Sequence, residues 1–313
     1  MRIGLMHGAR REPFTLVQAV DEAVRAEAEG FDSVWFPQLP TFGYDALTVI
    51  ALAGSQTNRI ELGTAVIPTF PTHPLTMAKQ ALTAQVACGG RLTLGLGLSH
   101  KPMIEDVMGL SYERPALHMR EYLTVTKSLI DDGWVDFQGQ DFQVRAELSV
   151  NESSPVPIVI AALAPRMLRM AGEIVDGTAT WMAGVKTVGE HIVPRIQSAA
   201  LSAGRPQPRV VVGLPVAVTD DPQSAREAAA RVFERYGQLT NYRRLLDIEG
   251  VEGPSEVTVV GNEAQVEQQL RAFASAGATE FIASVLPVGE NEQESIARTR
   301  SLLGSLVGKF KAA

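Results

Sequence analysis

The chain has 313 residues, of which 45% are hydrophobic and 20% charged, so it carries enough apolar material for a sizeable core and lacks the composition of a disordered chain. The 28 Lys and Arg residues stand against 35 Asp and Glu, and the net charge of −7 excludes a generally basic surface of the kind that binds nucleic acid or anionic membranes. One cysteine, Cys88, and five histidines without a metal-binding spacing argue against disulfides and a structural metal.

The first residues carry no recognisable targeting signal. They lack the roughly 7–15-residue apolar run of a signal peptide, and no later stretch approaches the ~18 apolar residues of a membrane span. We therefore expect a cytoplasmic protein with no membrane and no nucleic acid among its partners. Because the surface as a whole is not basic, any anionic ligand would have to bind at a local site. The expected partner is a small-molecule substrate.

Short β-branched runs alternate with helix-spaced segments from one end of the chain to the other. Thr15 to Gln18 forms a capping-box pattern that predicts a helix start, and Gly30 follows the end of that helix. Pro74 stands at a favourable first-turn position of a later helix. In the first half of the chain, the pattern predicts strands at 3–6, 33–36, 60–67 and 92–96 and helices from 16 up to Gly30 and at 45–55, 74–87 and 117–130.

The rhythm breaks between residues 133 and 157, where aromatic and β-branched residues stand among Gly, Gln and Asp. This composition predicts a small β-hairpin insertion. Beyond it the pattern resumes, with strands expected at 158–161, 178–181, 210–218 and 280–285 and helices at 166–174, 187–203, 223–248, 263–276 and 292–307.

Eight strands alternating with at least eight helices predict a single (β/α)₈ TIM-barrel domain over residues 1–313 with small insertions. A doubly wound open sheet is the alternative arrangement of the same elements. Barrels of this kind place their chemistry at the carboxyl ends of the strands. The residues that follow each strand are therefore the candidates for a functional site.

Three segments after strands have compositions suited to a binding site. Residues 95–100 resemble a poor dinucleotide fingerprint, and their two glycines would let either a flat ligand or a neighbouring backbone approach closely. Residues 61–74 contain three prolines, which make this segment stiff. It could form a wall that holds a ring in place, or it could be an ordinary connector. Residues 161–166 include Pro165, where a helix is expected to begin. The free backbone N–H groups of this helix start and Arg166 could bind a phosphate or carboxylate, or this could be an ordinary helix start.

Among single residues, His7 and His100 fall at predicted strand ends, where they would face the barrel mouth and could donate protons. His73, His118 and His191 are expected at the surface or in packing. Trp181 and several methionines at strand ends suit either the core or an apolar pocket. The sequence has no G-x-S-x-G elbow and no P-loop, which argues against an α/β-hydrolase and a nucleotidase.

Taken in order, several motifs resemble the luciferase-like monooxygenase superfamily over nearly the whole chain. The sequence is most similar to the branch that uses the deazaflavin coenzyme F420, rather than to the FMN-dependent luciferases. The motifs are GFDSVW at 30–35, TNRIELGTAV at 57–66, GRLTLGLG at 90–97, REYL at 120–123, Ala171-Gly172 and Asp176-Gly177.

The resemblance implies a homodimeric barrel whose cofactor ring rests on a bulge after the third strand, often with a cis peptide between non-proline residues. Here the bulge would be Ala65-Val66. The turn after strand four would line the pyrimidine side of the ring, and the start of the helix after strand five would hold the phosphate of the tail. The implied cofactor-binding set is Thr64, Ala65, Val66, Gly97, Leu98, Ser99, His100, Ala162, Leu163, Ala164, Arg166 and Trp181.

One departure from the family affects the expected chemistry. Many members of this branch have Asp-His after strand two, but the matching residues here are Gln38-Leu39, and a leucine cannot transfer a proton. The expected catalytic candidates are therefore His100, His7 and Gln38, unless water supplies the proton. The implied function is F420-dependent hydride transfer to or from a small organic substrate. The alternatives are an FMN-dependent two-component monooxygenase and a non-catalytic deazaflavin-binding protein.

Overall fold

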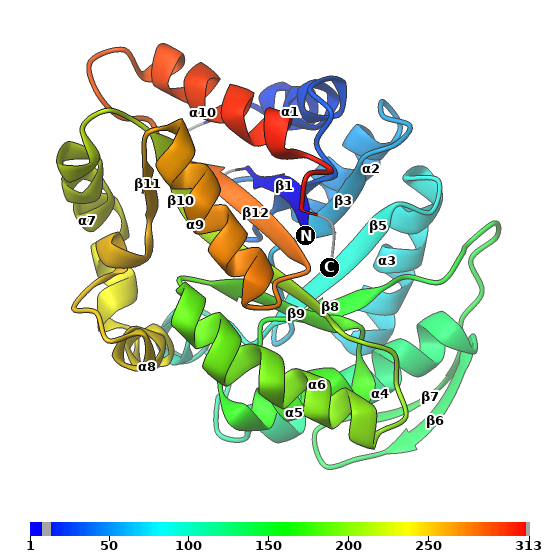
Figure 1. Ribbon diagram of the computed structural model, residues 1–313. Helices are drawn as coiled ribbons and strands as arrows, with labels where there is room; N and C mark the ends of the chain where they lie inside the picture. Colours follow the sequence, from blue (N-terminus) through cyan, green and yellow to red (C-terminus); the bar gives the residue numbers. More distant parts are fainter. Residues whose placement is uncertain (8–13, 311–313) are drawn as a thin grey trace.

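The computed structural model describes residues 1–7 and 14–310, and its centre is a closed barrel of eight parallel strands (Figure 1). Around the barrel, each strand pairs with the next one in this order, and the last pairs with the first. The strands are β1 (Arg2–Met6), β2 (Ser33–Phe36), β3 (Glu61–Thr64), β5 (Leu92–Gly97), β8 (Ile158–Ile160), β9 (Gly177–Trp181), β10 (Arg209–Val218) and β12 (Glu280–Val285). The predicted TIM barrel is confirmed, and the open sheet is excluded because β12 pairs with β1.

Helices surround this barrel, as Figure 1 shows. The predicted capping box is present at the first of them, because Gln18 N–H donates to Thr15 Oγ1 at 3.2 Å and Thr15 N–H donates to Gln18 Oε1 at 2.7 Å. The helices are α1 (Leu16–Ala28), α2 (Ala46–Gly54), α3 (Pro74–Ala87), α4 (Pro115–Asp131), α5 (Pro165–Ile174), α6 (Val193–Ser202), α7 (Pro222–Gln238), α8 (Thr240–Glu249), α9 (Glu263–Ser275) and α10 (Glu292–Leu306).

Two predicted elements are divided in the structure. The strand expected at 60–67 is β3 followed by β4 (Ile67–Pro68), and the two are separated by a cis peptide bond between Ala65 and Val66. The helix expected at 223–248 is α7 followed by α8, because Leu239 adopts an extended conformation with φ −80° and ψ 123°. The bulge lies where the family resemblance places it.

Short elements carry too little sequence signal to be predicted. The three-residue strand β11 (Val259–Gly261) pairs with the end of β10, outside the closed barrel. Single helical turns lie at η1 (Met103–Val107), η2 (Thr187–Ile192) and η3 (Pro254–Val257), and η2 forms the start of the helix that the sequence predicts at 187–203.

An antiparallel hairpin lies within residues 133–157, where the sequence predicts an insertion. Its strands are β6 (Trp134–Gln138) and β7 (Gln143–Glu147). The carboxylate of Glu121 on α4 accepts hydrogen bonds from three successive backbone N–H groups at the hairpin turn, over 2.8 to 3.0 Å. This carboxylate therefore fixes the hairpin to the outer helices.

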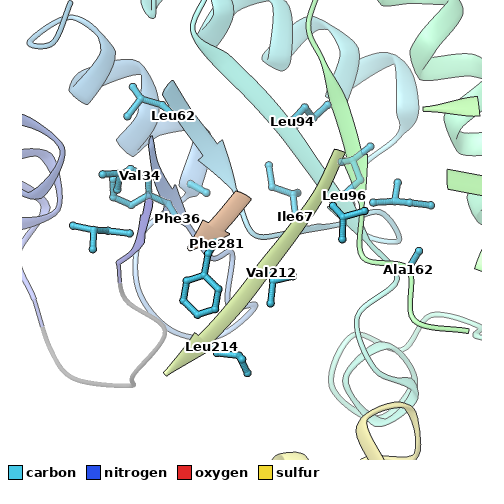
Figure 2. Packing of buried hydrophobic residues seen from close by; sticks show 14 of the residues in the cluster. Val34, Phe36, Leu62, Ile67, Leu94, Leu96, Ala162, Val212, Leu214 and Phe281 are labelled. Atoms are coloured by element: carbon cyan, nitrogen blue, oxygen red, sulfur yellow. The ribbon is translucent and has the colours of Figure 1, made fainter. Parts of the chain in front are cut away.

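Side chains alternate between the inside and the outside of the barrel along each strand. The outward-facing ones form the main core between strands and helices, which Figure 2 shows around Val34, Leu62, Val212 and Phe281. The inward-facing ones include a separate apolar group around Trp35, with Val159, Ala179, Val211 and Ile282.

A charged layer closes the amino end of the barrel interior. The Arg209 guanidinium lies 2.7 Å from Glu61 and 2.6 Å from Glu280, and Arg2 lies 2.6 Å from Glu61. Trp35 Nε1 donates to Glu280 at 3.0 Å, which links this layer to the apolar group above it. With its amino end closed, the barrel opens only towards the carboxyl ends of its strands.

Candidate functional site

A cleft of about 950 Å³, including space open to solvent, lies at the carboxyl ends of the barrel strands. Its floor is the upper end of the apolar barrel interior, formed by Met6, Ala179 and Ile282. This is the end of a barrel at which the loops after the strands supply functional groups.

The Ala65-Val66 bulge forms one wall of the cleft, and two glycines of β5 make room for it. A Cβ atom at Gly95 would lie 1.9 Å from the carbonyl oxygen of Thr64, and one at Gly97 would lie 2.5 Å from Cγ2 of Val66. Of the two interpretations of this glycine-containing segment, the structure therefore favours the close approach of a neighbouring backbone over contact with a ligand.

Two residues of the implied cofactor set support this wall from behind instead of lining the cleft. Thr64 is fully buried, and its Oγ1 donates to the Gly95 carbonyl at 2.8 Å and accepts from the Gly95 N–H at 2.7 Å. Gly97 is buried against Val66. Both residues hold the bulge in place.

The turn after β5 brings Ser99 and His100 to the cleft, whereas Leu98 packs against the core. Ser99 has a φ of 59°, a left-handed conformation that residues other than glycine seldom adopt. Burial lowers the pKa of His100, and the nearby Arg235 cation lowers it further. The imidazole is therefore neutral at pH 7.

The loop after β2 places Gln38 and Leu39 in the cleft. The Gln38 Oε1 accepts the Ala46 N–H at 2.7 Å and so holds the start of α2. An amide does not transfer protons at neutral pH, so Gln38 can orient a ligand but cannot act as a general acid.

The expectation that His7 faces the barrel mouth is wrong. Met6 points into the barrel, so the next side chain points outward, into a small pocket between β1, β2 and the first helices. The His7 ring packs edge-on against Phe14, with ring centres 4.8 Å apart, and burial lowers its pKa. His100 is thus the one predicted histidine that reaches the cleft.

At the end of β8, Leu163 lines the cleft and also a second cavity of about 590 Å³ beside it. His191 Nε2 donates to the Leu163 carbonyl at 2.8 Å and fixes this part of the chain. The second cavity continues along Ala164 and Pro165 at the start of α5 and reaches Arg244 on α8.

The charged residue predicted near this point lies elsewhere. Arg166 is exposed on α5 and lines neither cavity, and Ala162 is fully buried. Arg244 is exposed at the second cavity and makes no ion pair or hydrogen bond within residues 1–7 and 14–310. No sequence motif marks Arg244, because its position depends on how α8 folds back towards α5.

Aromatic side chains border the cleft between β9 and the turn after β5. We call Trp181, Tyr236, Tyr242 and His100 the aromatic arc. Neighbouring ring centres along it lie 6.0, 5.1 and 5.8 Å apart. Trp181 Nε1 is buried and has no hydrogen-bond partner among the described residues. The sequence marks Trp181 but neither tyrosine, because α7 and α8 come from a distant part of the chain.

Other classes of site find no support in the residues that the structure describes. In this part of the chain, no group of three or more His, Cys, Asp or Glu side chains is placed to hold a metal ion. The helices among these residues also lack the combined length and apolarity that crossing a bilayer requires.

Comparison with known proteins agrees with the geometry of the cleft. The sequence profile of the family described as luciferase-like monooxygenase matches residues 1–293. An F420-dependent glucose-6-phosphate dehydrogenase of Kineococcus radiotolerans is 28% identical over 298 residues, which cover 90% of this chain and 86% of that protein.

Two solved structures share the fold at low sequence identity. An F420-dependent secondary alcohol dehydrogenase in complex with an F420-acetone adduct has a TM-score of 0.79 and 18% identity, over 99% of both chains. The oxygenating constituent of 3,6-diketocamphane monooxygenase from Pseudomonas putida, in complex with FMN, has a TM-score of 0.77 and 16% identity, over 100% of this chain and 99% of its own.

Proposed function

Because the chain belongs to the luciferase-like monooxygenase family, we propose that it is an oxidoreductase that uses coenzyme F420 to transfer hydride to or from a small organic substrate. Two relatives that match 90% and 95% of this chain are F420-dependent glucose-6-phosphate dehydrogenases, which supports an enzyme over a non-catalytic binding protein. The observation that carries the proposal is the apolar cleft at the carboxyl ends of the strands, with the cis Ala65-Val66 bulge as its wall.

The residues around the cleft fit a molecule with a flat ring and an anionic tail. Ala65 and Val66 offer an apolar surface on which the ring can rest, and Ser99 and His100 stand beside it. The tail of the coenzyme would lie in the second cavity, which shares Leu163 with the cleft. Its phosphate would there reach the start of α5, where backbone N–H groups favour an anion. Arg244 on the opposite side of this cavity supplies a positive charge.

When bound, the deazaflavin supplies the hydride chemistry. The protein orients the ring against the bulge and keeps water from the floor of the cleft with apolar side chains. His100 moves the proton: its neutral imidazole accepts one when a substrate is oxidised, and its imidazolium donates one when a substrate is reduced. Leu39 occupies the place of the missing family histidine and takes no part in proton transfer.

Binding of the coenzyme tests this proposal directly. Purified protein is titrated with oxidised F420 and, separately, with FMN, and the quenching of fluorescence is followed. We expect a dissociation constant for F420 in the micromolar range or below. A dissociation constant weaker than about 100 μM, or about −5.5 kcal/mol, would contradict the proposal.

The second candidate function is an FMN-dependent monooxygenase, and the structural neighbour with bound FMN favours it as the alternative. The same cleft would then hold reduced FMN for reaction with oxygen. Protein that purifies with a flavin spectrum, or that consumes oxygen in the presence of reduced FMN but does not bind F420, would support this alternative.

A further inference from the structure

One end of the aromatic arc, Trp181, faces the Ala65-Val66 wall across the cleft, and the other end, His100, lies in the turn after β5, next to this wall. Trp181 ends β9, which is separated from β3 by β5 and β8 on one side of the barrel, so the indole stands nearly opposite the bulge. Tyr236 on α7 and Tyr242 on α8 continue from the indole towards His100. A ring that rests on the bulge therefore leaves the arc to contact the substrate.

The arc presents one hydrogen-bond donor that lacks an acceptor. Trp181 Nε1 is buried, lines the same cleft through its side chain, and has no partner among the described residues. A buried donor without a partner is unfavourable, because it has lost its hydrogen bonds to water and gained none in return. Phe233 and Tyr236 pack edge-on against the indole and hold it in this orientation, with ring centres 5.8 and 6.0 Å away.

The arc carries no charge at neutral pH. Burial lowers the pKa of His100 and raises that of the Tyr242 phenol, so both groups are neutral. The other described residues that line the cleft include no Lys, Arg, Asp or Glu, and the Arg235 cation that acts on His100 is exposed and does not line the cleft. A charged substrate group placed against the arc would lose its hydration without gaining an opposite charge from these residues.

We propose that the substrate is a neutral, ring-containing compound that packs on the aromatic arc and accepts a hydrogen bond from Trp181 Nε1. Trp181 is then a specificity-determining residue. The inference rests on the proposed function for the identity of the reaction, but it holds for either coenzyme because Trp181 lies across the cleft from the bulge. The proposed substrate class, a neutral compound, differs from the charged sugar phosphate in the name of a relative, the F420-dependent glucose-6-phosphate dehydrogenase.

Three probes of similar size test the inference. Acetophenone is neutral and has an acceptor oxygen, ethylbenzene is neutral without one, and benzoate is charged. Each probe and glucose 6-phosphate are titrated by calorimetry onto protein saturated with oxidised F420, which cannot reduce the ketone. We expect acetophenone to bind at least tenfold more tightly than benzoate or glucose 6-phosphate.

The variant Trp181→Phe keeps an aromatic ring and removes the donor. We expect it to shift the ratio of the acetophenone and ethylbenzene dissociation constants by about three- to tenfold in favour of ethylbenzene, the scale of one hydrogen bond. Trp134→Phe, on the hairpin far from the cleft, is the matched control and should leave this ratio unchanged.

The outcomes separate this inference from the proposed function. Wild-type protein that fails to bind F420 contradicts the proposed function, and the same probes are then titrated onto protein without coenzyme. Normal F420 binding combined with benzoate or glucose 6-phosphate affinity equal to that of acetophenone overturns the inference. So does a Trp181→Phe variant that folds, binds F420 and keeps the wild-type ratio.

Discussion

At the scale of single residues, the direction of a side chain decides which predicted group reaches the cleft. His7 and His100 both follow a barrel strand, yet only His100 lines the cleft, because strand alternation turns His7 outward next to the inward-facing Met6. Arg166 and Arg244 both lie near the start of α5, yet only Arg244 borders the second cavity, which shares Leu163 with the cleft.

The proton-transfer role of His100 predicts a pH dependence. Because burial lowers its pKa, the imidazolium needed for substrate reduction forms only below the ordinary range, so kcat for reduction should rise as the pH falls. In the oxidative direction, kcat should fall as the pH falls. His100→Gln should remove both trends while the F420 dissociation constant changes little. Steady-state kinetics from pH 5 to 8 measure this, and an unchanged profile in the variant would exclude the role.

The position of Arg244 predicts how the coenzyme tail is held. Arg244→Gln should weaken F420 binding by about 1.5 kcal/mol, roughly tenfold, the scale of a hydrogen bond to a charged group. Binding of the deazaflavin core without its phosphate should not change. Arg166→Gln is the matched control and should have little effect, because that side chain lines neither cavity. Fluorescence titration measures both ligands; a larger loss in Arg166→Gln would reverse the assignment.

At the scale of secondary-structure elements, the bulge between β3 and β4 depends on the adjacent strand. The Gly97 position on β5 has no space for a Cβ atom, because Cγ2 of Val66 would lie 2.5 Å away. Substitution there would act by displacing the wall, not by filling the space of the ring. The bulge and the glycine therefore form one packing unit.

This unit predicts a compensating pair of substitutions. Gly97→Ala should push Val66 out of place and weaken F420 binding by tenfold or more, because the ring rests on the displaced bulge. Adding Val66→Ala removes the clashing methyl groups and should restore much of the affinity, while Val66→Ala alone should have a small effect. Dissociation constants for the four proteins complete the cycle. If the losses of F420 affinity in the two single variants simply add up in the double variant, the two positions are not coupled.

The sequence predicts the elements better than their interruptions. Alternating strand and helix patterns are local, so the eight barrel strands are found from them. The bulge at Ala65-Val66 is predicted by the family resemblance and not by the local pattern, because the break of β3 depends on pairing with β5. The bend at Leu239 is missed, because it depends on the packing of α8 and is not a local property. The two tyrosines of the arc and Arg244 are missed for the same reason, since they reach the cleft only through α7 and α8.

At the scale of the whole molecule, the two ends of the barrel have different tasks. The carboxyl end holds the cleft, and the amino end holds the charged layer of Arg2, Glu61, Arg209 and Glu280. Although burial opposes ionisation, Arg209 and Arg2 hold the pKa of Glu61 below its ordinary value. The charged layer lies at the end of the barrel opposite the cleft, so we expect it to contribute to stability and not to catalysis.

This division predicts separate effects on stability and binding. The Glu280 side chain is 1% exposed and pairs with the partly buried Arg209, so Glu280→Gln leaves this guanidinium with Glu61 as its one remaining carboxylate among the described residues. It should lower the free energy of unfolding by on the order of 3 kcal/mol. The F420 dissociation constant should stay within about twofold of wild type, a change well under 1 kcal/mol, because Glu280 lies at the amino end of the barrel and the cleft lies at the carboxyl end. Urea unfolding and fluorescence titration test the two parts, and a large loss of coenzyme affinity in folded protein would contradict the separation.

The continuity of α7 and α8 has a practical consequence for protein engineering. Residues 222–249 form one uninterrupted stretch that supplies both tyrosines of the arc and Arg244, and none of the barrel strands. Exchanging this stretch with that of a relative would replace both tyrosines of the arc and Arg244 in one step, while Trp181 and the scaffold that carries the bulge keep their native sequence. Such a chimaera would show how much of the substrate preference the tyrosines contribute apart from Trp181.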